Sequence, residues 1–248
     1  YHMHIEVQKL MVPQQTLTLL VLQDATKLNQ RVQQLKLAAL GQLSASIAHE
    51  IRNPLAAIAQ ANELLGDSDP HQQASLSRMI AKQTQRIDRI IQDTLNMVRN
   101  KETHPAIIEL KQFIPLLIQE DLADIATQIK YTVRSQVFIH FDEAQLRQVL
   151  INLIRNAIRH NSPQHSHIEL NVSIHEANVY IDVRDFGTGV ASKDLAHLFQ
   201  PFFSTEITGT GLGLYLSHSF CEANQAKLHY VKQEQGACFR IECLRVGL

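Results

Sequence analysis

The sequence predicts an α+β protein in which a helical hairpin is followed by an α/β sandwich domain. Over residues 28–97, apolar residues recur every three or four positions, a spacing typical of helices that bury one face. Further along the chain, short segments alternate apolar and polar residues between helical stretches, as strands with one buried face do. Helices that cover one face of an antiparallel sheet form such a sandwich.

The first strand pattern is TLTLLVLQD, residues 16–24, which ends in a polar turn. Because the chain begins Tyr-His-Met-His and shows no basic-then-apolar leader, we expect a piece of a longer protein. Residues 1–27 would be the remnant of an upstream, PAS-like domain and a linker. Membrane attachment is expected only through a missing upstream segment, since the apolar run at residues 19–22 is far below the roughly 20 residues of a span.

The hairpin is predicted from two apolar stripes separated by a turn over residues 66–70. The second stripe has the alternating steps of four and three that are typical of a coiled-coil seam. Because one hairpin cannot cover both stripes, we expect a homodimer that completes a four-helix bundle. The first stripe comprises Val32, Leu35, Ala39, Leu43, Ile47, Ile51, Leu55 and Ile58, and the second comprises Leu76, Ile80, Gln83, Ile87, Ile90, Thr94 and Met97.

The second domain is predicted from residue 104 to residue 248. Its antiparallel sheet is expected to close with a hairpin that has Gly236 near its turn. The predicted helices cover residues 110–126, 143–159 and 213–223, and the predicted strands cover residues 133–141, 168–174, 179–185 and the two arms of 227–244.

Composition excludes several functions. The formal net charge of −1 over 248 residues argues against a nucleic-acid-binding surface, and the hydrophobic content of 45% indicates a soluble globular chain. Cys221, Cys238 and Cys243 are odd in number and lack CxxC spacing, so buried reduced thiols are expected rather than disulfides or a zinc site. His165 and His167 have no accompanying carboxylate or thiol, and a polar loop explains them better than a metal does.

The segment SASIAHEIRNPLAAI, residues 44–58, places a histidine, a glutamate and an asparagine close together. His49 lies opposite the apolar stripe and is expected to face solvent. Glu50 can hold one ring nitrogen protonated or accept a proton, and Asn53 lies one turn further on the same face. Pro54 removes a helical hydrogen bond and is expected to bend the helix there. Most exposed helical histidines have no function, so this segment alone leaves both interpretations open.

A second group of polar residues lies in QVLINLIRNAIRH, residues 148–160. Asn152 and Asn156 share one helical face, and so do Arg155 and Arg159. Amide oxygens can ligate hydrated Mg²⁺, and a guanidinium can hold phosphate oxygens. An ordinary amphipathic helix with a polar outer face explains the pattern equally well.

Two glycine-rich segments follow. In DFGTG, Asp185 ends a predicted strand and can accept a hydrogen bond from an exocyclic amine, which favours adenine over guanine, although such a segment is often only a turn. In ITGTGLGL, residues 207–214, glycines precede a helix whose N-terminus attracts phosphate. The spacing is GxGxG rather than GxGxxG, which argues against a Rossmann dinucleotide site.

The order of these segments is more specific than any one of them. Together with PFF at residues 201–203, they resemble the catalytic core of the sensor histidine kinases of two-component systems over residues 28–248. Among these kinases, the pilus-regulating and nitrogen-regulatory members are the most similar, and the pilus-type resemblance is the closer one. The similarity lies in the sequence QQLKLAALGQLSASIAHEIRNPLAAI and in the short stretch between Phe203 and Gly209.

This resemblance implies a dimerisation and phosphotransfer domain over residues 28–103 and a Bergerat-type ATP-binding domain over residues 104–248. It implies that His49 is phosphorylated, that Glu50 is its acid/base partner and that Asn53 orients water for dephosphorylation of a receiver domain. For the nucleotide it implies Asn152 and Asn156 as Mg²⁺ ligands, Arg159 at phosphate, Asp185 at adenine, and Gly187, Gly189, Phe203, Gly209, Thr210, Gly211, Leu212 and Gly213 around ATP, with Phe202 beside them.

The resemblance also implies partners and a location. The partners are a response regulator and a second copy of the chain, and the location is the cytoplasmic side of a bacterial inner-membrane sensor. The segment over residues 101–105 would be a hinge for the ATP-binding domain. Glu206 departs from the family, which often has Lys there, so phosphate contacts from that loop are in doubt. The alternatives are a Bergerat-fold ATPase or serine kinase, a nucleotide-binding scaffold, and a phosphatase-dominated relative.

Overall fold

The computed structural model describes residues 3–12, 15–24, 44, 47–66, 68–98, 103–205 and 209–247. The chain forms two compact units, Tyr1–Gln83 and Thr84–Leu248. The division falls inside a long helix, so the domain boundaries at residues 28 and 104 stay predictions. Each unit is described by itself below.

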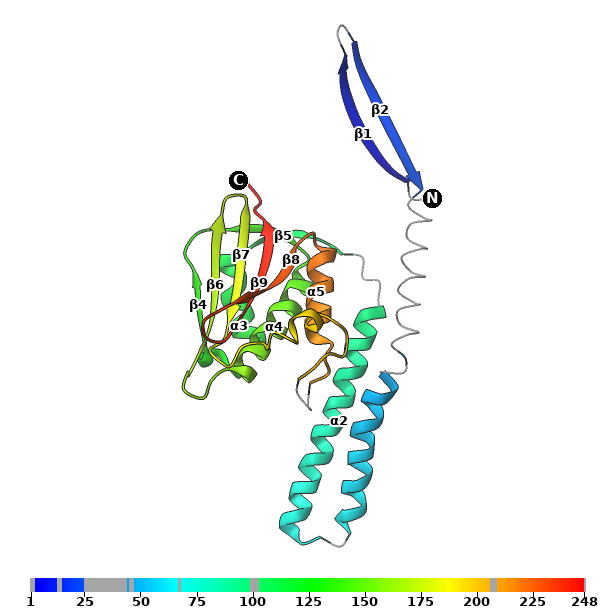
Figure 1. Ribbon diagram of the computed structural model, residues 1–248, viewed down its shortest axis with the longest axis vertical. Helices are drawn as coiled ribbons and strands as arrows, with labels where there is room; N and C mark the ends of the chain where they lie inside the picture. Colours follow the sequence, from blue (N-terminus) through cyan, green and yellow to red (C-terminus); the bar gives the residue numbers. More distant parts are fainter. Residues whose placement is uncertain are drawn as a thin grey trace. The chain divides into compact units, whose positions relative to one another are not determined.

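The first unit begins with an antiparallel ribbon of two strands, β1 (Met3–Val12) and β2 (Gln15–Asp24) (Figure 1). The strand predicted at residues 16–24 is therefore present. Its partner β1 was not predicted, because its alternation of apolar and polar residues breaks at Lys9, where apolar residues become consecutive.

Two helices follow in the hairpin segment. The first covers residues 47–65 and continues through Pro54, and the second is α2 (Pro70–Val98). Between them Asp69 caps α2, since its Oδ1 accepts hydrogen bonds from the N–H groups of His71 and Gln72 at 2.8 and 2.9 Å. The turn predicted at residues 66–70 is thus confirmed.

The predicted stripes are visible in the burial of these helices. In α2, Leu76, Ile80, Gln83, Ile87 and Thr94 are half-buried and Ile90 is fully buried. In the first helix, Ile47, Ile51 and Ile58 are half-buried, whereas Leu55 is 51% exposed. Val32, Leu35, Ala39, Leu43 and the side chain of Met97 lie outside the described part of the chain.

The second unit is built on a five-stranded sheet with the order β4-β6-β7-β9-β8. The helices α3, α4 and α5 lie on one face of this sheet (Figure 1). The strands are β4 (Ile129–Val133), β6 (Ile168–His175), β7 (Asn178–Arg184), β8 (Lys227–Lys232) and β9 (Ala237–Leu244), and the helices are α3 (Leu110–Asp121), α4 (Glu143–His160) and α5 (Gly213–Ala223).

Most predicted elements of this unit are confirmed. The helix α5 has the predicted bounds, α4 ends one residue later than predicted, and the hairpins β6-β7 and β8-β9 are antiparallel. Gly236 precedes β9 with a φ of 80°, which glycine adopts without the steric cost of a Cβ. The two-layer α+β sandwich is therefore the fold of this unit.

Three predictions need correction. The helix predicted to residue 126 ends at Asp121, and a short 3₁₀ turn, η1 (Ala126–Gln128), follows. The strand predicted at residues 133–141 is two strands, because β4 ends at Val133 and β5 (Phe138–Phe141) pairs with β3 (Ala106–Glu109) in a separate ladder. The sheet is mixed rather than antiparallel, since β4 and β6 are parallel.

The N-terminus of α4 is fixed by a buried polar network. The Asp142 carboxylate accepts from the N–H groups of Gln145 and His104 at 3.0 and 2.9 Å, and its own N–H donates to Asn224 Oδ1 at 2.7 Å. Burial by itself would raise the pKa of the Asp142 carboxyl, but the N–H donors of His104, Gln145 and Ala144 together lower it. The network ties β5, α4 and the end of α5 together.

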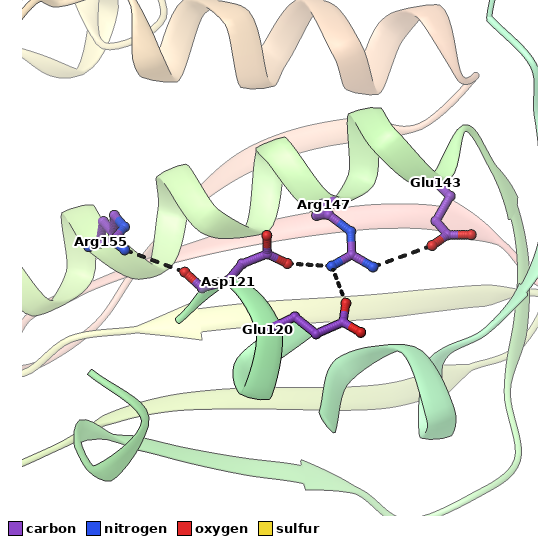
Figure 2. Close-up of polar contacts among 5 residues, drawn as sticks. All are labelled: Glu120, Asp121, Glu143, Arg147 and Arg155. Atoms are coloured by element: carbon purple, nitrogen blue, oxygen red, sulfur yellow. Dashed lines mark hydrogen bonds and ion pairs between the residues drawn. The ribbon is translucent and has the colours of Figure 1, made fainter. Parts of the chain in front are cut away.

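A cluster of charges joins α3 to α4 on the surface (Figure 2). Arg147 contacts Asp121, and it also contacts Glu120 and Glu143 at 3.0 and 3.4 Å. Burial lowers the pKa of the Arg147 guanidinium, but the acceptors Asp121, Glu120 and Glu143 outweigh that effect and raise it. The cluster therefore fastens α3 to α4, the helix that carries Asn152 and Asn156.

Candidate functional site

The histidine segment lies on the helix over residues 47–65. His49 and Asn53 are exposed on it, as are Ala56 and Gln60 further along the same face, and Glu50 is half-buried. The predicted exposure of the imidazole is confirmed. Pro54, by contrast, is buried. A residue one turn away on a helix lies beside its neighbour, so Asn53 can approach any group that binds to His49.

A cavity of about 750 Å³ lies in the second unit. This volume is within the range of about 300–1,000 Å³ that is usual for small-molecule sites. Its lining includes predicted site residues from four separate segments, namely Asn152, Asn156, Arg159, Asp185, Gly189, Phe203, Gly209, Thr210, Gly211 and Gly213. Apolar side chains, among them Ile151, Leu198 and Phe220, complete the wall. The fold thus brings residues distant in sequence to one place.

Asp185 lines this cavity and is only 3% exposed. Its Oδ1 accepts from the N–H groups of Gly187 at 2.9 Å and Ala237 at 3.1 Å, and its own N–H donates to the Ala237 carbonyl at 2.9 Å. One carboxylate oxygen is therefore engaged by the backbone. The other acceptor can receive a hydrogen bond from an amine that enters the cavity.

The turn after Asp185 packs directly on the end of α4. A Cβ at Gly187 would overlap the His160 carbonyl oxygen, so only glycine allows this approach. Gly187 does not line the cavity, whereas Gly189 does. Gly187 therefore brings the turn close to α4. Its predicted contact with a nucleotide stays a prediction.

Asn152 and Asn156 differ in their surroundings. The Asn152 amide nitrogen donates to Ser217 Oγ at 2.9 Å, and a Cβ at Gly213 would overlap the Asn152 oxygen. Asn152 thus holds the start of α5 against α4. Asn156 is half-buried and lines the cavity. Amide oxygens are suitable Mg²⁺ ligands, and Asn156 fits that role better than Asn152.

The glycine loop leads into α5. Gly211 has a φ of 66°, and a Cβ there would overlap the backbone of Phe202, which itself has a φ of 64°. Thr210 Oγ1 accepts from the Leu212 N–H at 3.3 Å and donates to Asp93 of α2 at 3.1 Å. Leu212 is fully buried and packs inside rather than lining the cavity. The first N–H groups of a helix have no carbonyl partner within the helix, so the start of α5 suits an anion.

Two of the arginines of α4, Arg155 and Arg159, line the cavity. Arg155 binds both carboxylate oxygens of Asp124 at 3.1 Å and the Asp121 carbonyl at 3.4 Å, so it fastens α4 to the end of α3 (Figure 2). Its guanidinium is therefore already engaged by carboxylate and carbonyl oxygens, and the phosphate contact of Arg159 stays a prediction. Glu206 and hinge residues 101 and 102 lie outside the described part of the chain.

Sequence reasoning missed three contributors to the site. They are Asn161 at the end of α4, Ser217 on α5 and the Ala237 N–H group. Ser217 lies one helical turn after Gly213, a spacing that could have drawn attention to it. Asn161 in HNSP looked like an ordinary turn residue, and a backbone N–H leaves no mark in a sequence.

The cysteines and the histidine pair behave as ordinary structural residues. Burial raises the pKa of Cys221 and raises that of Cys238 and Cys243 to about 12, so all three are thiols at neutral pH, as expected. His165 stacks on Phe186. Among the residues the structure describes, there is no group of three or more acidic, histidine or cysteine side chains that could hold a metal ion. None of the described helices has the length and hydropathy that a membrane span requires.

Two family models match the chain. The His Kinase A (phospho-acceptor) domain matches residues 39–103, and the histidine kinase-, DNA gyrase B- and HSP90-like ATPase matches residues 141–247. The first model includes His49, and the second includes every predicted nucleotide-site residue from Asn152 to Gly213.

Curated relatives match across both regions. The chain is 37% identical to the sensor protein kinase PilS of Pseudomonas aeruginosa over 90% of its own length and 44% of that protein. It is 35% identical to the sensor histidine kinase ZraS of Escherichia coli over 83% of its length and 46% of that protein. The chain therefore spans less than half the length of these relatives.

Solved structures share the fold. A complex of histidine kinase ThkA with response regulator protein TrrA matches 98% of this chain and 75% of that one, with a TM-score of 0.72 and 20% identity. The Acinetobacter baumannii histidine kinase AdeS matches 80% of this chain and 98% of that one, with a TM-score of 0.61 and 21% identity. At these identities the likeness concerns the fold.

Proposed function

The chain belongs to the sensor histidine kinases, and from that premise we propose that it phosphorylates itself on His49 with ATP and then passes the phosphoryl group to an aspartate of a response regulator. The observation that carries the proposal is the cavity that gathers Asn156, Arg159, Asp185 and the glycine loop. These groups suit a nucleotide, since they combine an acceptor for an amine, a guanidinium and the first backbone N–H groups of a helix.

In the proposed reaction, an imidazole nitrogen of His49 attacks the γ-phosphorus of ATP in line. The new bond joins that nitrogen to phosphorus, and the bond from phosphorus to the bridging oxygen breaks and releases ADP. Glu50 accepts the proton from the imidazole. Phosphoryl transfer depends mainly on positioning and charge neutralisation, and these are what Arg159 and the start of α5 supply.

Magnesium is proposed as the metal that accompanies ATP. It would neutralise phosphate charge, and the donor set fits it, because Asn156 presents an amide oxygen in a polar wall of the cavity. Asn152 serves as a second candidate ligand, although its amide also contacts Ser217.

The partners follow from the hairpin. Large apolar side chains, among them Leu55 and Leu95 at 51% and 43% exposure, lie on its described helices, and we propose that a second copy of the chain covers them in a four-helix bundle. The receiver domain of a response regulator would approach the exposed face around His49. The membrane, if the whole protein is attached to one, would be reached through a segment outside this chain, with these domains on the cytoplasmic side.

A second activity is favoured by the exposure of Asn53 beside His49. An amide one turn from the imidazole can hold a water molecule against a phosphorylated receiver. The proposal therefore includes dephosphorylation of the same response regulator.

The test is incubation of the chain with γ-labelled ATP and Mg²⁺. We expect protein-bound label that survives alkali and is lost in acid, as a phosphohistidine is, and that is absent from His49→Gln. His71→Gln is the matched control, because His71 is also an exposed histidine of the hairpin, and it should retain the label. Label that persists in His49→Gln, or that resists acid, would overturn the assignment of His49.

A further inference from the structure

The segment that follows α4 makes an unusual set of contacts with the turn after Asp185. Asn161 uses its whole side chain, since its Oδ1 accepts from the Phe186 N–H at 2.9 Å and its Nδ2 donates to the carbonyls of His165 and His167 at 3.0 and 3.1 Å. The amide therefore connects three backbone segments. A side chain with both donors and its acceptor engaged is held in one orientation.

The ring of Phe186 is held by the same segment. The His165 ring stacks on it with centroids 4.5 Å apart and an angle of 11° between the planes, and the Arg184 guanidinium lies 4.8 Å from its centroid. Both the backbone and the side chain of Phe186 are thus fixed by neighbours outside the turn itself. Rings stacked in this way gain stability beyond the burial of their area.

The position of Phe186 sets the orientation of Asp185. The Oδ1 atom of the Asp185 carboxylate accepts hydrogen bonds from two N–H groups, that of Ala237 in β9 and that of Gly187. Phe186 lies between Asp185 and Gly187, so its peptide groups determine where that second donor points. Asn161 is the partner that the structure gives to the N–H of Phe186.

We propose that Asn161 is a positioning residue for nucleotide-base recognition, acting through the Phe186 N–H to hold the Asp185 carboxylate toward the exocyclic amine of adenine. The inference rests on the proposed use of ATP. Guanine has a carbonyl where adenine has this amine, so a carboxylate in that position favours adenine and disfavours guanine. Loss of the positioning contact reduces the preference, whereas loss of general stability does not.

The first test compares binding of ADP and GDP, each with Mg²⁺, to the whole chain by titration calorimetry. Asn161→Ala should weaken ADP binding by about three- to tenfold, the effect of one hydrogen bond, and leave GDP binding unchanged. Asn161→Asp keeps an acceptor for the Phe186 N–H and should retain more of the ADP preference than alanine does. In autophosphorylation, Asn161→Ala should raise the KM for ATP and leave kcat unchanged.

Asn178→Ala is the matched control. Its amide donates to Glu242 at 2.9 Å at the start of β7, whereas the turn with Phe186 follows the end of that strand. Its loss therefore removes a side-chain hydrogen bond away from this turn. It should leave the ratio of ADP to GDP affinity at the wild-type value. An equal fall of the ratio in both variants, or an unchanged ratio in Asn161→Ala, would overturn the inference.

A second test needs no nucleotide. Hydrogen exchange of the Phe186 amide should become faster in Asn161→Ala, because the acceptor of that N–H is removed, and should stay slow in Asn178→Ala. An unchanged exchange rate of the Phe186 amide in Asn161→Ala would contradict the positioning role of Asn161, and it would leave the proposed function standing. Failure of the wild-type chain to bind ADP would instead contradict the proposed function, and the inference with it.

Discussion

The hairpin helices, residues 47–65 and α2, differ from the part of the second unit that follows α2 in how far their apolar residues are buried. That part, residues 103–247, is called the nucleotide-binding unit below. In the second unit, helices α3 and α4 and the sheet bury one continuous core that includes Leu117, Leu150 and Ile181, all fully buried. On the described helices of the hairpin, only Ala61 and Ile90 are buried hydrophobic residues, while Leu64 and Leu95 are 59% and 43% exposed.

The difference shows which region is complete by itself. A sheet covered by helices encloses a core between two layers, whereas two helices have too little surface to enclose one. We infer that the stability of the nucleotide-binding unit is a property of the single chain. The stability of the hairpin depends on a second copy, so it should vary with protein concentration.

The largest expected effect is in the core of the nucleotide-binding unit. Leu150→Ala should lower the free energy of unfolding of this unit by about 2–5 kcal/mol, because it removes buried methyl groups and leaves a cavity. Urea denaturation followed by the fluorescence of a bound nucleotide analogue measures it. Leu116→Ala on α3, where the side chain is 49% exposed, should change the free energy by less than about 0.5 kcal/mol. Similar losses in the two variants would contradict a self-contained core.

The next effect tests the incomplete region. Leu95→Glu should raise the dissociation constant of the proposed homodimer by about tenfold or more, equal to about 1.4 kcal/mol, because it places a charge on the proposed apolar contact surface. Sedimentation equilibrium measures the constant. Leu116→Glu is the matched control, since Leu116 is similarly exposed but lies in the other region, and it should leave dimerisation unchanged. A Leu95→Glu chain that dimerises like the wild type would remove Leu95 from the interface.

A smaller effect is expected at the N-terminus of α4. Asp142→Ala should destabilise the nucleotide-binding unit by about 1 kcal/mol, the usual value for a lost helix cap. The pKa of Asp142 is lower in the folded chain, so its ionised form contributes stability above the unfolded value of about 3.9. That contribution is lost as the pH falls through the lower folded value. Thermal melts from pH 7 down to pH 3 should therefore show a steeper fall for the wild type than for Asp142→Asn; parallel curves would contradict the assignment.

The smallest effect concerns the charge cluster of Figure 2. Arg147→Ala should cost about 0.2–1 kcal/mol, because the ion pairs are near the surface and partly exposed. Raising the salt concentration should shrink the difference from the wild type. Denaturation in low and high salt measures this, and a difference that does not depend on salt would point to the contact of Arg147 with the Phe113 ring instead.

Long, periodic elements were predictable from local pattern. The helices α4 and α5 and the hairpin strands β6 and β7 lie within a residue or two of the predicted bounds, because their apolar spacing is regular and their ends carry caps or turns. Short strands were not predictable. The strand β3 has four residues, and its pairing with β5 is set by a partner about thirty positions away in the chain, which no local pattern encodes.

Most of the predicted nucleotide residues lie together in the folded chain. The predicted likeness to sensor histidine kinases is confirmed, and a PilS sensor is among the relatives. The cavity contains most of the predicted nucleotide residues, whereas Gly187 and Leu212 support its walls from behind. The chemical roles of His49, Glu50, Asn53 and the nucleotide residues stay predictions.

The sequence by itself determined which segments form the long helices, and it predicted which residues carry chemistry. His49 was distinguishable by its place opposite an apolar stripe, and Asp185 by its place at the end of a strand before glycines. Only the tertiary structure decided that Arg155 pairs with Asp124 and that Asn161 holds Phe186. The physical reason is that helix and strand periodicity depends on neighbours a few residues apart, whereas these contacts join side chains and backbone groups that packing alone brings together.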